Sequence, residues 1–270
     1  MPKAGHPFIV RLLFWSQWQN ERPFFLPDGE RVEIEATSTR HFSMALVMEL
    51  CDSNLEVHLH SHFKRDEAWL RTLVHFLAEI QLALAFLHRS NMAYRDLKPE
   101  NVLVVGSASD GQVHCKLADF GFARELDPED QQQVETFAGT PYYFAPEIER
   151  HTRRQQALED AVDVYSYGTL AYALGHGPGY CRQGNTMGNR NDHPRCHFGG
   201  NCRACAGCEN VAKLRENWKE SLREDAGRQL AELVESCVVI RPEERPRIQG
   251  LQSYELFQHV QFKRLLQLDL

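Results

Sequence analysis

Residues 94–101 read Tyr-Arg-Asp-Leu-Lys-Pro-Glu-Asn, and this stretch decides the fold. It follows a segment of helical periodicity and precedes residues 102–105, whose apolar run predicts a short strand. Asp96 and Asn101 stand five residues apart, and Asp119 follows eighteen residues after Asn101, beyond a predicted hairpin. A loop placed in this way can bring one acid and two oxygen ligands for a metal ion to a single cleft.

These residue types are the ones that phosphoryl transfer to a hydroxyl requires. The reaction needs a carboxylate to accept the hydroxyl proton, oxygen ligands for magnesium, and cations on the phosphates. Magnesium prefers oxygen ligands and keeps few protein contacts, so one Asp and one Asn are sufficient. The pattern therefore indicates a phosphotransfer site.

Three motifs, in this order, resemble those of the eukaryotic protein kinase family. Residues 94–101 resemble its catalytic loop, Asp-Phe-Gly at 119–121 resembles its metal-binding motif, and Ala-Pro-Glu at 145–147 resembles the end of its activation segment. The resemblance implies an α+β, protein-kinase-like fold. A partial β N-lobe is expected over residues 1–51, and a mostly helical C-lobe over residues 52–270.

The resemblance also implies a role for each residue of the loop. Asp96 is expected to be the catalytic base and Lys98 to hold the γ-phosphate of ATP. Asn101 and Asp119 are expected to bind Mg²⁺. A Lys two residues after the base is typical of the Ser/Thr type, and Tyr94 stands where a His is commoner.

A second Ser/Thr-type feature is Gly-Thr-Pro-Tyr-Tyr at residues 139–143, in which Thr140 is expected to hydrogen-bond to Asp96 and Lys98. Thr136, just before it, resembles an activation-loop phosphorylation site. A phosphate there adds charge that an arginine can capture, and Arg95 is the natural partner. The alternative is an unmodified loop threonine.

Residues 6–10 resemble the turn into the fourth strand of the kinase N-lobe, and this resemblance indicates where the nucleotide contacts should fall. Met48 then falls at the gatekeeper position and residues 49–51 form the hinge. Glu49, Cys51 and Leu103, together with Asp119, are therefore expected to bind the nucleotide.

Two further resemblances concern structure rather than chemistry. Asp163 resembles the helical Asp that braces the backbone of the catalytic loop, and Arg245 resembles the Arg that pairs with Glu147. Buried charges of this kind need partners.

Part of the nucleotide machinery is missing from the sequence. No Gly-x-Gly-x-x-Gly occurs, and no Lys lies between Lys3 and Lys64 to serve as the phosphate-binding lysine of the third strand. One hypothesis is an N-terminally truncated version of a longer kinase, and the intact catalytic motifs favour it. The other is a short chain that works as a pseudokinase or scaffold. In both, this chain alone is expected to bind ATP poorly.

A Cys- and His-rich insertion is predicted at about residues 175–210. Cys196, Cys202, Cys205 and Cys208 supply four thiols, and Cys-x2-Cys spacing suits a tetrahedral zinc site. All four fall within thirteen residues, whereas most zinc sites join two separated pairs. Part of an iron–sulfur run and a surface loop of free thiols remain open as alternatives.

Composition narrows the partners and the compartment. The 270 residues carry 30 Lys and Arg against 37 Asp and Glu, a net charge of -7. This argues against binding to nucleic acid or to an anionic membrane. No secretory signal is visible in residues 1–10, so the 8 cysteines are expected as thiols or metal ligands in the cytoplasm or nucleus.

The remaining periodicities predict the framework. Strands are expected at residues 8–14 and 44–50, with an inserted hairpin within about 15–41. Helices with one apolar face are expected at 70–87 and 230–237, the first as a buried helix and not a membrane span. A well-buried helix, with aromatic and small residues on most faces, is expected at about 160–174. Together these features predict a protein serine/threonine kinase that takes ATP and a protein substrate.

Overall fold

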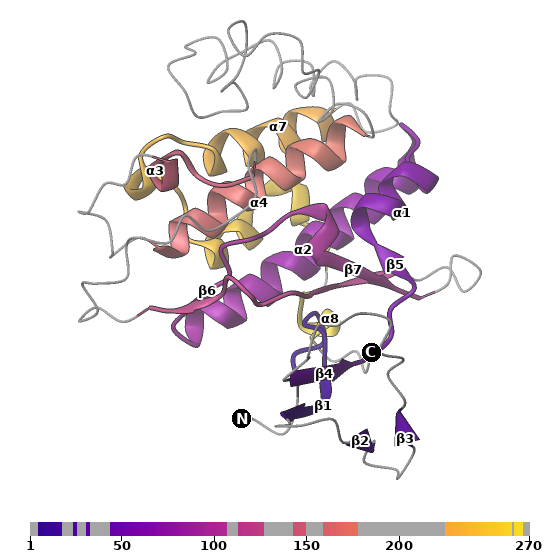
Figure 1. Ribbon diagram of the computed structural model, residues 1–270. Helices are drawn as coiled ribbons and strands as arrows, with labels where there is room; N and C mark the ends of the chain where they lie inside the picture. The colour runs from indigo at the N-terminus through magenta and orange to yellow at the C-terminus, as the bar shows by residue number, and fades with distance from the viewer. Residues whose placement is uncertain are drawn as a thin grey trace, which may run out of the picture.

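The structure is a computed structural model that describes residues 5–17, 24–25, 31–32, 44–106, 113–126, 143–149, 159–177, 225–260 and 262–266. Within these ranges a helical body carries small sheets along one side, and a two-stranded ribbon projects away from it (Figure 1). The architecture is the α+β arrangement that the sequence predicts.

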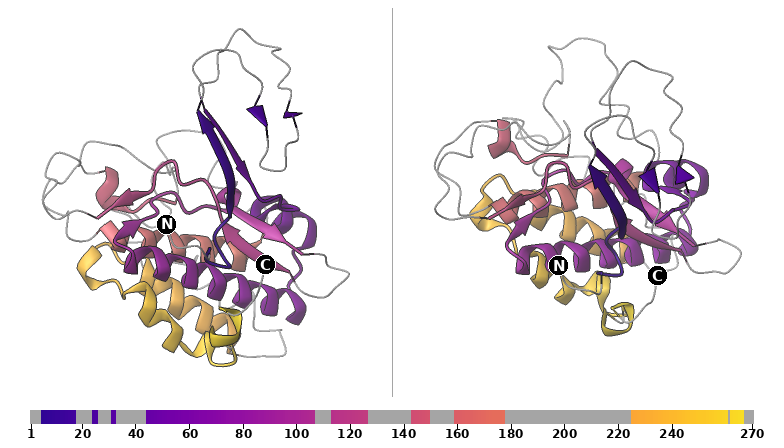
Figure 2. Two further views of the ribbon diagram at one scale, coloured as in Figure 1. Left: turned by 90° about the horizontal axis from the view of Figure 1, so that it is seen from below. Right: turned by 60° about the horizontal axis from the view of Figure 1, so that its bottom comes forward.

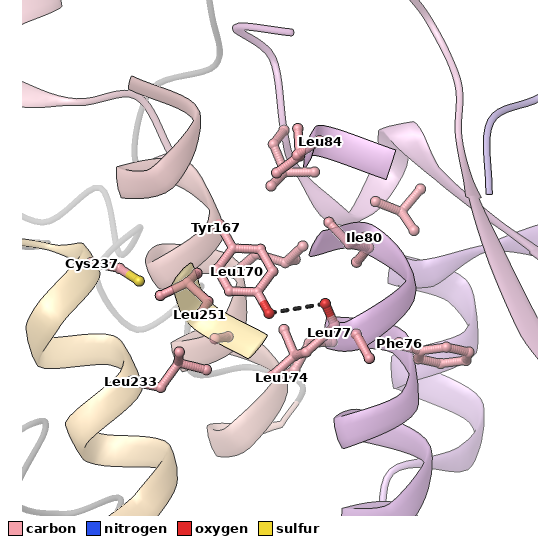
Figure 3. Close-up of a cluster of buried hydrophobic side chains, with 14 of the residues drawn as sticks. Phe76, Leu77, Ile80, Leu84, Tyr167, Leu170, Leu174, Leu233, Cys237 and Leu251 are labelled. Carbon is pink, nitrogen blue, oxygen red and sulfur yellow. Dashed lines mark hydrogen bonds between the residues drawn. The ribbon is translucent and has the colours of Figure 1, made fainter. Parts of the chain in front are cut away.

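The helical body is built around α2 (Glu67–Arg89), α4 (Glu159–His176) and α7 (Ala226–Cys237). Apolar side chains of all three form one buried cluster, which Figure 3 shows between the helices. Tyr167 of α4 donates its hydroxyl to the main-chain oxygen of Leu77 of α2 at 2.9 Å, which satisfies a polar group inside the core. The three helices predicted from the sequence are confirmed, each with longer bounds.

The contact between α4 and α7 depends on a glycine. A Cβ atom at Gly168 would lie 2.5 Å from the Cβ of Cys237, closer than packed carbon atoms approach. Because Gly168 has no side chain, the backbone of α4 can pack directly against the side chain of Cys237 on α7.

A three-stranded sheet lies against α2, in the order β5 (Ser53–Asn54), β7 (Val102–Val105) and β8 (His114–Leu117). All pairs are antiparallel, and the register sets Leu103 opposite Lys116. Val102 and Val104 are buried, so this face of β7 belongs to the core.

The ribbon consists of β1 (Leu12–Gln17) and β4 (Met44–Met48), with a short antiparallel pair β2 (Phe24–Phe25) and β3 (Arg31–Val32) in the connection (Figure 2). The strand expected at residues 8–14 is shifted, because residues 8–10 pair instead with Leu117 of β8. The antiparallel pair of β2 and β3 lies within the hairpin expected at about residues 15–41.

The other elements are short. α1 (Leu55–His62) was not expected from the sequence. It is capped by Asn54, whose side chain accepts a hydrogen bond from the Val57 amide at 2.9 Å. The rest are β6 (Met92–Ala93) paired with β9 (Arg124–Glu125), α3 (Pro146–Glu149), α8 (Phe262–Leu265), and the 3₁₀ turns η1 (Pro99–Asn101), η4 (Pro242–Glu244), η5 (Ile248–Ser253) and η6 (Glu255–Phe257).

Among the described helices, α2 is the one that is long and apolar enough to cross a membrane by length and composition. In the fold, 72% of its most apolar window is buried inside the protein. Its apolar character is therefore accounted for by the core.

Candidate active site

The loop that contains Asp96 is held from below by Asp163 of α4. The Asp163 carboxylate accepts hydrogen bonds from the main-chain amides of Tyr94 at 2.8 Å and Arg95 at 2.7 Å. Arg95 has φ of 70°, a left-handed conformation that a non-glycine residue adopts at a cost. The two hydrogen bonds offset that cost, so Asp163 fixes the entry into the loop as the sequence predicts.

His88 is a third partner of this carboxylate. Its Nε2 atom lies 2.8 Å from Oδ2 of Asp163, and both side chains are buried. Sequence reasoning missed this role, because a histidine near the end of an amphipathic helix has no pattern that distinguishes packing from pairing. The contact ties the end of α2 to α4 directly beneath the loop.

Asp96 lies at the centre of a small polar cluster. Its Oδ2 atom is 3.0 Å from the Lys98 ammonium nitrogen and 2.8 Å from Nδ2 of Asn101, which also donates to the Asp96 main-chain oxygen at 3.0 Å. Asp96 is buried, whereas Lys98 is partly exposed. The structure thus brings together three of the predicted site residues, with the ammonium balancing the buried carboxylate.

Asp119 approaches this cluster from the end of β8. The Ala118 amide donates to the main-chain oxygen of Asn101 at 2.9 Å, which joins the two segments. Asp119 itself has φ of 50° and an exposed position, and its Oδ1 accepts the Gly121 amide at 3.2 Å. Asp119 therefore has a left-handed backbone and an exposed carboxylate next to the loop.

The donor set fits magnesium. Asn101 uses its Nδ2 atom toward Asp96, so its side-chain oxygen is the atom left to coordinate a cation. Asp119 adds a carboxylate, and Mg²⁺ is bound in proteins by few such oxygens with water completing the shell. In the described part of the chain, no three His, Cys, Asp or Glu side chains form a metal cluster.

Tyr94 links the loop to the segment that carries Asp119. Its hydroxyl donates to the main-chain oxygen of Ala118, and its ring meets Phe120 edge to face at 5.4 Å between centroids. Burial, followed by the charges of Asp96, Asp119 and Asp163, raises the pKa of Tyr94 well above its usual value. The phenol therefore stays protonated and donates at physiological pH.

The predicted hinge begins with Glu49, whose side chain is not turned to solvent. Both of its oxygens lie 2.9 Å from the ammonium nitrogen of Lys116, and Oε1 also accepts the Arg11 amide at 2.7 Å. Cys51 is partly buried, and burial is the main cause that raises its pKa. Leu103 is half-buried on β7, opposite Lys116.

Lys116, the partner of Glu49, is a residue that sequence reasoning did not single out. It lies within an apolar strand, where periodicity indicates only the strand itself. The one available signal was a charged residue in the middle of that strand, which needs a partner when it is buried.

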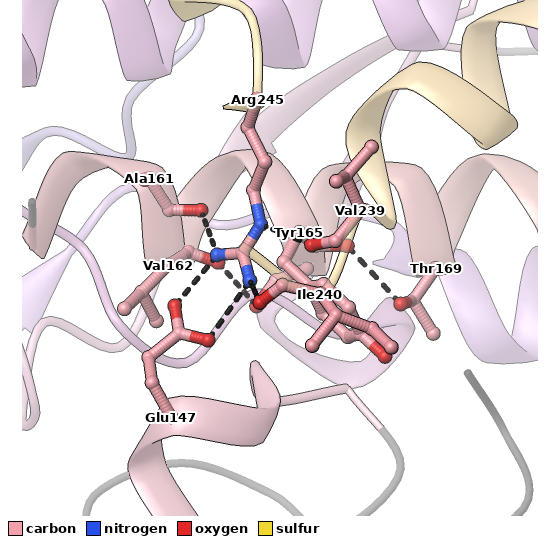
Figure 4. Close-up of polar contacts among 9 residues, drawn as sticks. Glu147, Ala161, Val162, Tyr165, Thr169, Val239, Ile240 and Arg245 are labelled. Carbon is pink, nitrogen blue, oxygen red and sulfur yellow. Dashed lines mark hydrogen bonds and ion pairs between the residues drawn. The ribbon is translucent and has the colours of Figure 1, made fainter. Parts of the chain in front are cut away.

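Farther from the loop, Arg245 connects three segments of the described C-lobe. Its guanidinium pairs with Glu147 of α3 and also donates to main-chain oxygens of Ala161, Val239 and Ile240 (Figure 4). It lies over the Tyr165 ring at 4.9 Å. The pairing expected between Arg245 and Glu147 is confirmed.

A family model for the protein kinase domain matches residues 2–257. The chain belongs to the protein kinase family. The kinase motifs, the fold and the loop geometry thus agree with one another.

Relatives of this kinase chain include Ser/Thr enzymes. It is 36% identical over 157 residues to the human serine/threonine-protein kinase Sgk2, and the aligned region covers 57% of this chain and 40% of that protein. It is 33% identical over 177 residues to the catalytic subunit of cAMP-dependent protein kinase of Dictyostelium discoideum, covering 65% of this chain and 22% of that protein. The chain therefore spans less than half the length of these relatives.

A solved structure supports the kinase fold. The crystal structure of the Rad53 kinase domain and SCD2 matches with a TM-score of 0.58 and 21% identity. The match covers 95% of this chain and 72% of that one. At this identity the likeness shows the fold alone.

Several expected site residues lie outside the described residues. They are Thr136, Thr140, Cys196, Cys202, Cys205 and Cys208. Residues 175–177, at the start of the predicted insertion, are the end of α4 and the residue after it, and residues 178–210 are not described. Phosphorylation of Thr136 and a metal in the insertion stay predictions.

Proposed function

We propose that this chain carries the phosphotransfer half of a protein serine/threonine kinase, which moves the γ-phosphate of ATP to a Ser or Thr hydroxyl. The observation that carries the proposal is the cluster in which Lys98 and Asn101 both contact the buried carboxylate of Asp96. A carboxylate, a cation and an amide oxygen at this spacing are what the reaction uses.

The proposed roles follow from where each group lies. Asp96 orients the substrate hydroxyl and accepts its proton, and Lys98, already within 3.0 Å of Asp96, neutralises charge on the transferred group. Asn101 and Asp119 would hold the metal. ATP, when bound with Mg²⁺, supplies the phosphoryl group and a leaving group whose charge the metal compensates.

Nucleotide affinity tests the metal-binding part of the proposal. Binding of ADP to the purified 270-residue chain is measured by isothermal titration calorimetry with Mg²⁺ and with EDTA. Weak, Mg²⁺-dependent binding is expected, and Asp119→Asn should abolish the Mg²⁺ dependence. Asp160→Asn, on α4 and partly buried, is the matched control and should leave the Mg²⁺ dependence intact. Binding that ignores Mg²⁺ in the unaltered chain would contradict the proposal.

Transfer is tested separately with radiolabelled ATP and a Ser/Thr-rich acceptor protein, followed by phosphoamino-acid analysis. Slow labelling of Ser or Thr is expected, and Asp96→Asn should remove it while ADP binding persists. Because the sequence lacks a glycine-rich loop, the same pair of chains is also assayed at high ATP concentration. Labelling that survives Asp96→Asn would show that another group serves as the base.

A non-catalytic binding role is the second candidate, and one observation favours it. Leu12, Trp15, Leu46 and Met48 on the β1–β4 ribbon are large apolar side chains that remain 43–58% exposed in the described structure. Exposed apolar clusters of this kind mark interaction surfaces. Mg²⁺-dependent nucleotide binding without any transfer, at all ATP concentrations, would select this role.

A further inference from the structure

Lys116 is a buried cation at the junction between the ribbon and the helical body. It is 2% exposed, and its ammonium nitrogen lies 2.9 Å from each oxygen of Glu49, whose side chain is 13% exposed. A pair this enclosed is screened little by solvent, unlike an exposed pair. The contact joins residues 67 positions apart, from β8 to the first residue after β4.

The register of the sheet shows which way Lys116 faces. Val104 and Cys115 are opposite one another, as are Val102 and Leu117, and all four are buried on the side of α2. Successive side chains of a strand alternate between faces. Leu103 and Lys116 therefore share the other face, where Lys116 meets Glu49 of the hinge.

Glu49 in turn connects three segments. Besides Lys116, its carboxylate accepts the Arg11 amide at 2.7 Å, and its own amide donates to the Arg11 main-chain oxygen at 3.0 Å. Two residues beyond Cys51, the chain enters β5, and the Asp52 amide donates to the Val104 main-chain oxygen at 3.0 Å. The hinge is thus held at both ends, by a side-chain pair at Glu49 and by the sheet at Asp52.

We propose that Lys116 is a positioning residue for the nucleotide base. By holding Glu49, it keeps the backbone of residues 49–51 at a fixed distance from Leu103, so that the hinge and the face of β7 form the two walls of one slot. The inference rests on the proposed function, since the slot is useful only to a chain that binds ATP.

The physical reason is the burial of the pair. Removing the ammonium would leave the Glu49 carboxylate enclosed without a counter-charge, and a carboxylate in that position moves toward water. Movement of Glu49 carries the hinge with it. Because this sequence has no glycine-rich loop, contacts to the nucleotide base must supply a larger share of the nucleotide affinity. Loss of the slot should therefore lower that affinity strongly.

The test separates the base from the phosphates. Affinities for adenosine and for Mg²⁺-tripolyphosphate are measured by calorimetry on the full chain and on Lys116→Met, which keeps the aliphatic stem without the charge. Adenosine affinity should fall about tenfold or more, as loss of one partner of a buried pair does, while tripolyphosphate affinity changes less than about twofold. Lys116→Arg should restore most of the adenosine affinity.

A second readout needs no nucleotide. Hydrogen exchange of the Glu49 and Asp52 amides should accelerate in Lys116→Met and not in Lys116→Arg, while amides of α7 exchange at unchanged rates. The Glu49→Gln variant should show the same acceleration, and combining it with Lys116→Met should add little, because both remove one interaction. Far-UV circular dichroism verifies that each variant is folded.

The outcomes are distinguishable. If Lys116→Met leaves hinge exchange and adenosine affinity unchanged, or weakens tripolyphosphate equally, the positioning role is overturned while the proposed function stands. If the unaltered chain binds neither adenosine nor Mg²⁺-tripolyphosphate, the proposed function fails, and the role of Lys116 toward a base fails with it.

Discussion

Arg245 and Glu147 form a two-point ion pair, with Nη1 to Oε1 at 2.6 Å and Nη2 to Oε2 at 2.8 Å. The pair joins the loop after η4 to the start of α3, 98 residues away in the sequence. The Arg245 side chain is fully buried, and its remaining donors reach main-chain oxygens. Nε, Nη1 and Nη2 of Arg245 all donate hydrogen bonds, so this residue holds α3 against the segment that follows η4.

Breaking this pair should strongly destabilise the protein. Arg245→Met leaves the Glu147 carboxylate without its partner and frees three main-chain oxygens, so a loss of about 3–5 kcal/mol of unfolding free energy is expected. Urea denaturation measures it. Arg241→Ala is the matched control: its pair with Glu244 at 3.0 Å is exposed on both sides, and a change within about 0.5 kcal/mol is expected. Equal losses in the two variants would contradict the argument.

Asp163→Asn should loosen the catalytic loop without removing the helix that carries it. The amide presents one acceptor oxygen where the carboxylate now receives the Tyr94 and Arg95 amides and contacts His88. Arg95, at φ of 70°, then loses the support of its left-handed conformation. Faster hydrogen exchange of the Tyr94 and Arg95 amides is expected, together with loss of about 2–3 kcal/mol of stability.

Asp160→Asn serves as the control for that change, since it lies on the same helix and is only partly buried. In Asp160→Asn, hydrogen exchange of the Tyr94 and Arg95 amides should be as slow as in the unaltered chain. If Asp163→Asn also left the loop amides protected, the support of Arg95 would have to come from elsewhere.

The sequence was sufficient for the catalytic loop because the loop is local. Asp96, Lys98 and Asn101 lie within six residues, so a motif specifies their mutual positions before any tertiary contact is known. The pairing of Asp163 with the loop was also accessible, but only through resemblance to a family, since 68 residues separate it from Arg95.

Other features depend on tertiary contacts that no local pattern encodes. The Lys116–Glu49 pair joins two segments whose sequences predict only strands, and His88 could pack or pair equally well by its position on α2. α1 was missed for a related reason: of its eight residues, LEVHLHSH, three are histidines, and the burial of His58 comes from neighbours supplied by α2. Residues 8–10 were expected in the N-lobe strand because β-branched and aromatic residues suit either partner, and only the fold selects β8.

Gly177 should not tolerate a side chain. It has φ of +88°, and a Cβ atom there would lie 2.3 Å from Cε1 of Phe63, the residue at the end of α1. Gly177→Ala should lower the melting temperature by several degrees, because the backbone is strained and the ring must move. Differential scanning calorimetry measures the change.

Gly250→Ala is the comparison that isolates this effect. A Cβ atom there meets nothing within 4 Å, and the residue has no left-handed φ. Its melting temperature should stay the same or rise slightly, because alanine reduces the entropy of the unfolded chain. A similar drop in both variants would mean that the fall reflects general sensitivity to glycine replacement.

Two histidines, the partly buried His6 and the buried His58, should make the protein less stable as the pH falls below neutrality. Burial lowers the pKa of His6 to about 4, with Arg89 adding to the effect, and burial together with His62 lowers the pKa of His58 to about 4. The His6 ring lies tilted against Phe86 at 4.9 Å between centroids. The His58 ring stacks on His62 at 4.3 Å and meets Phe76 edge-on. Both rings are therefore held neutral in the folded protein.

The sign follows from proton uptake. In the unfolded chain a histidine titrates near 6.5, so between about pH 6.5 and 4 the unfolded state binds protons that the folded state does not. Stability from these two residues is thus fully present above about pH 6.5 and declines steadily toward pH 4. Urea midpoints at pH 7.5, 6.0 and 5.0 should fall in that order, over a range in which most carboxylates are still ionised.

Replacement identifies the groups responsible. His58→Phe keeps the aromatic packing and removes the titration, so its urea midpoint should fall less between pH 7.5 and 5.0 than that of the unaltered chain, and His6→Phe should act in the same direction. His75→Gln, at an exposed position of α2, is the matched control and should leave the pH dependence unchanged. If His58→Phe and His6→Phe together keep the full decline, the protons enter at other groups and the burial of these two rings does not set the pH response.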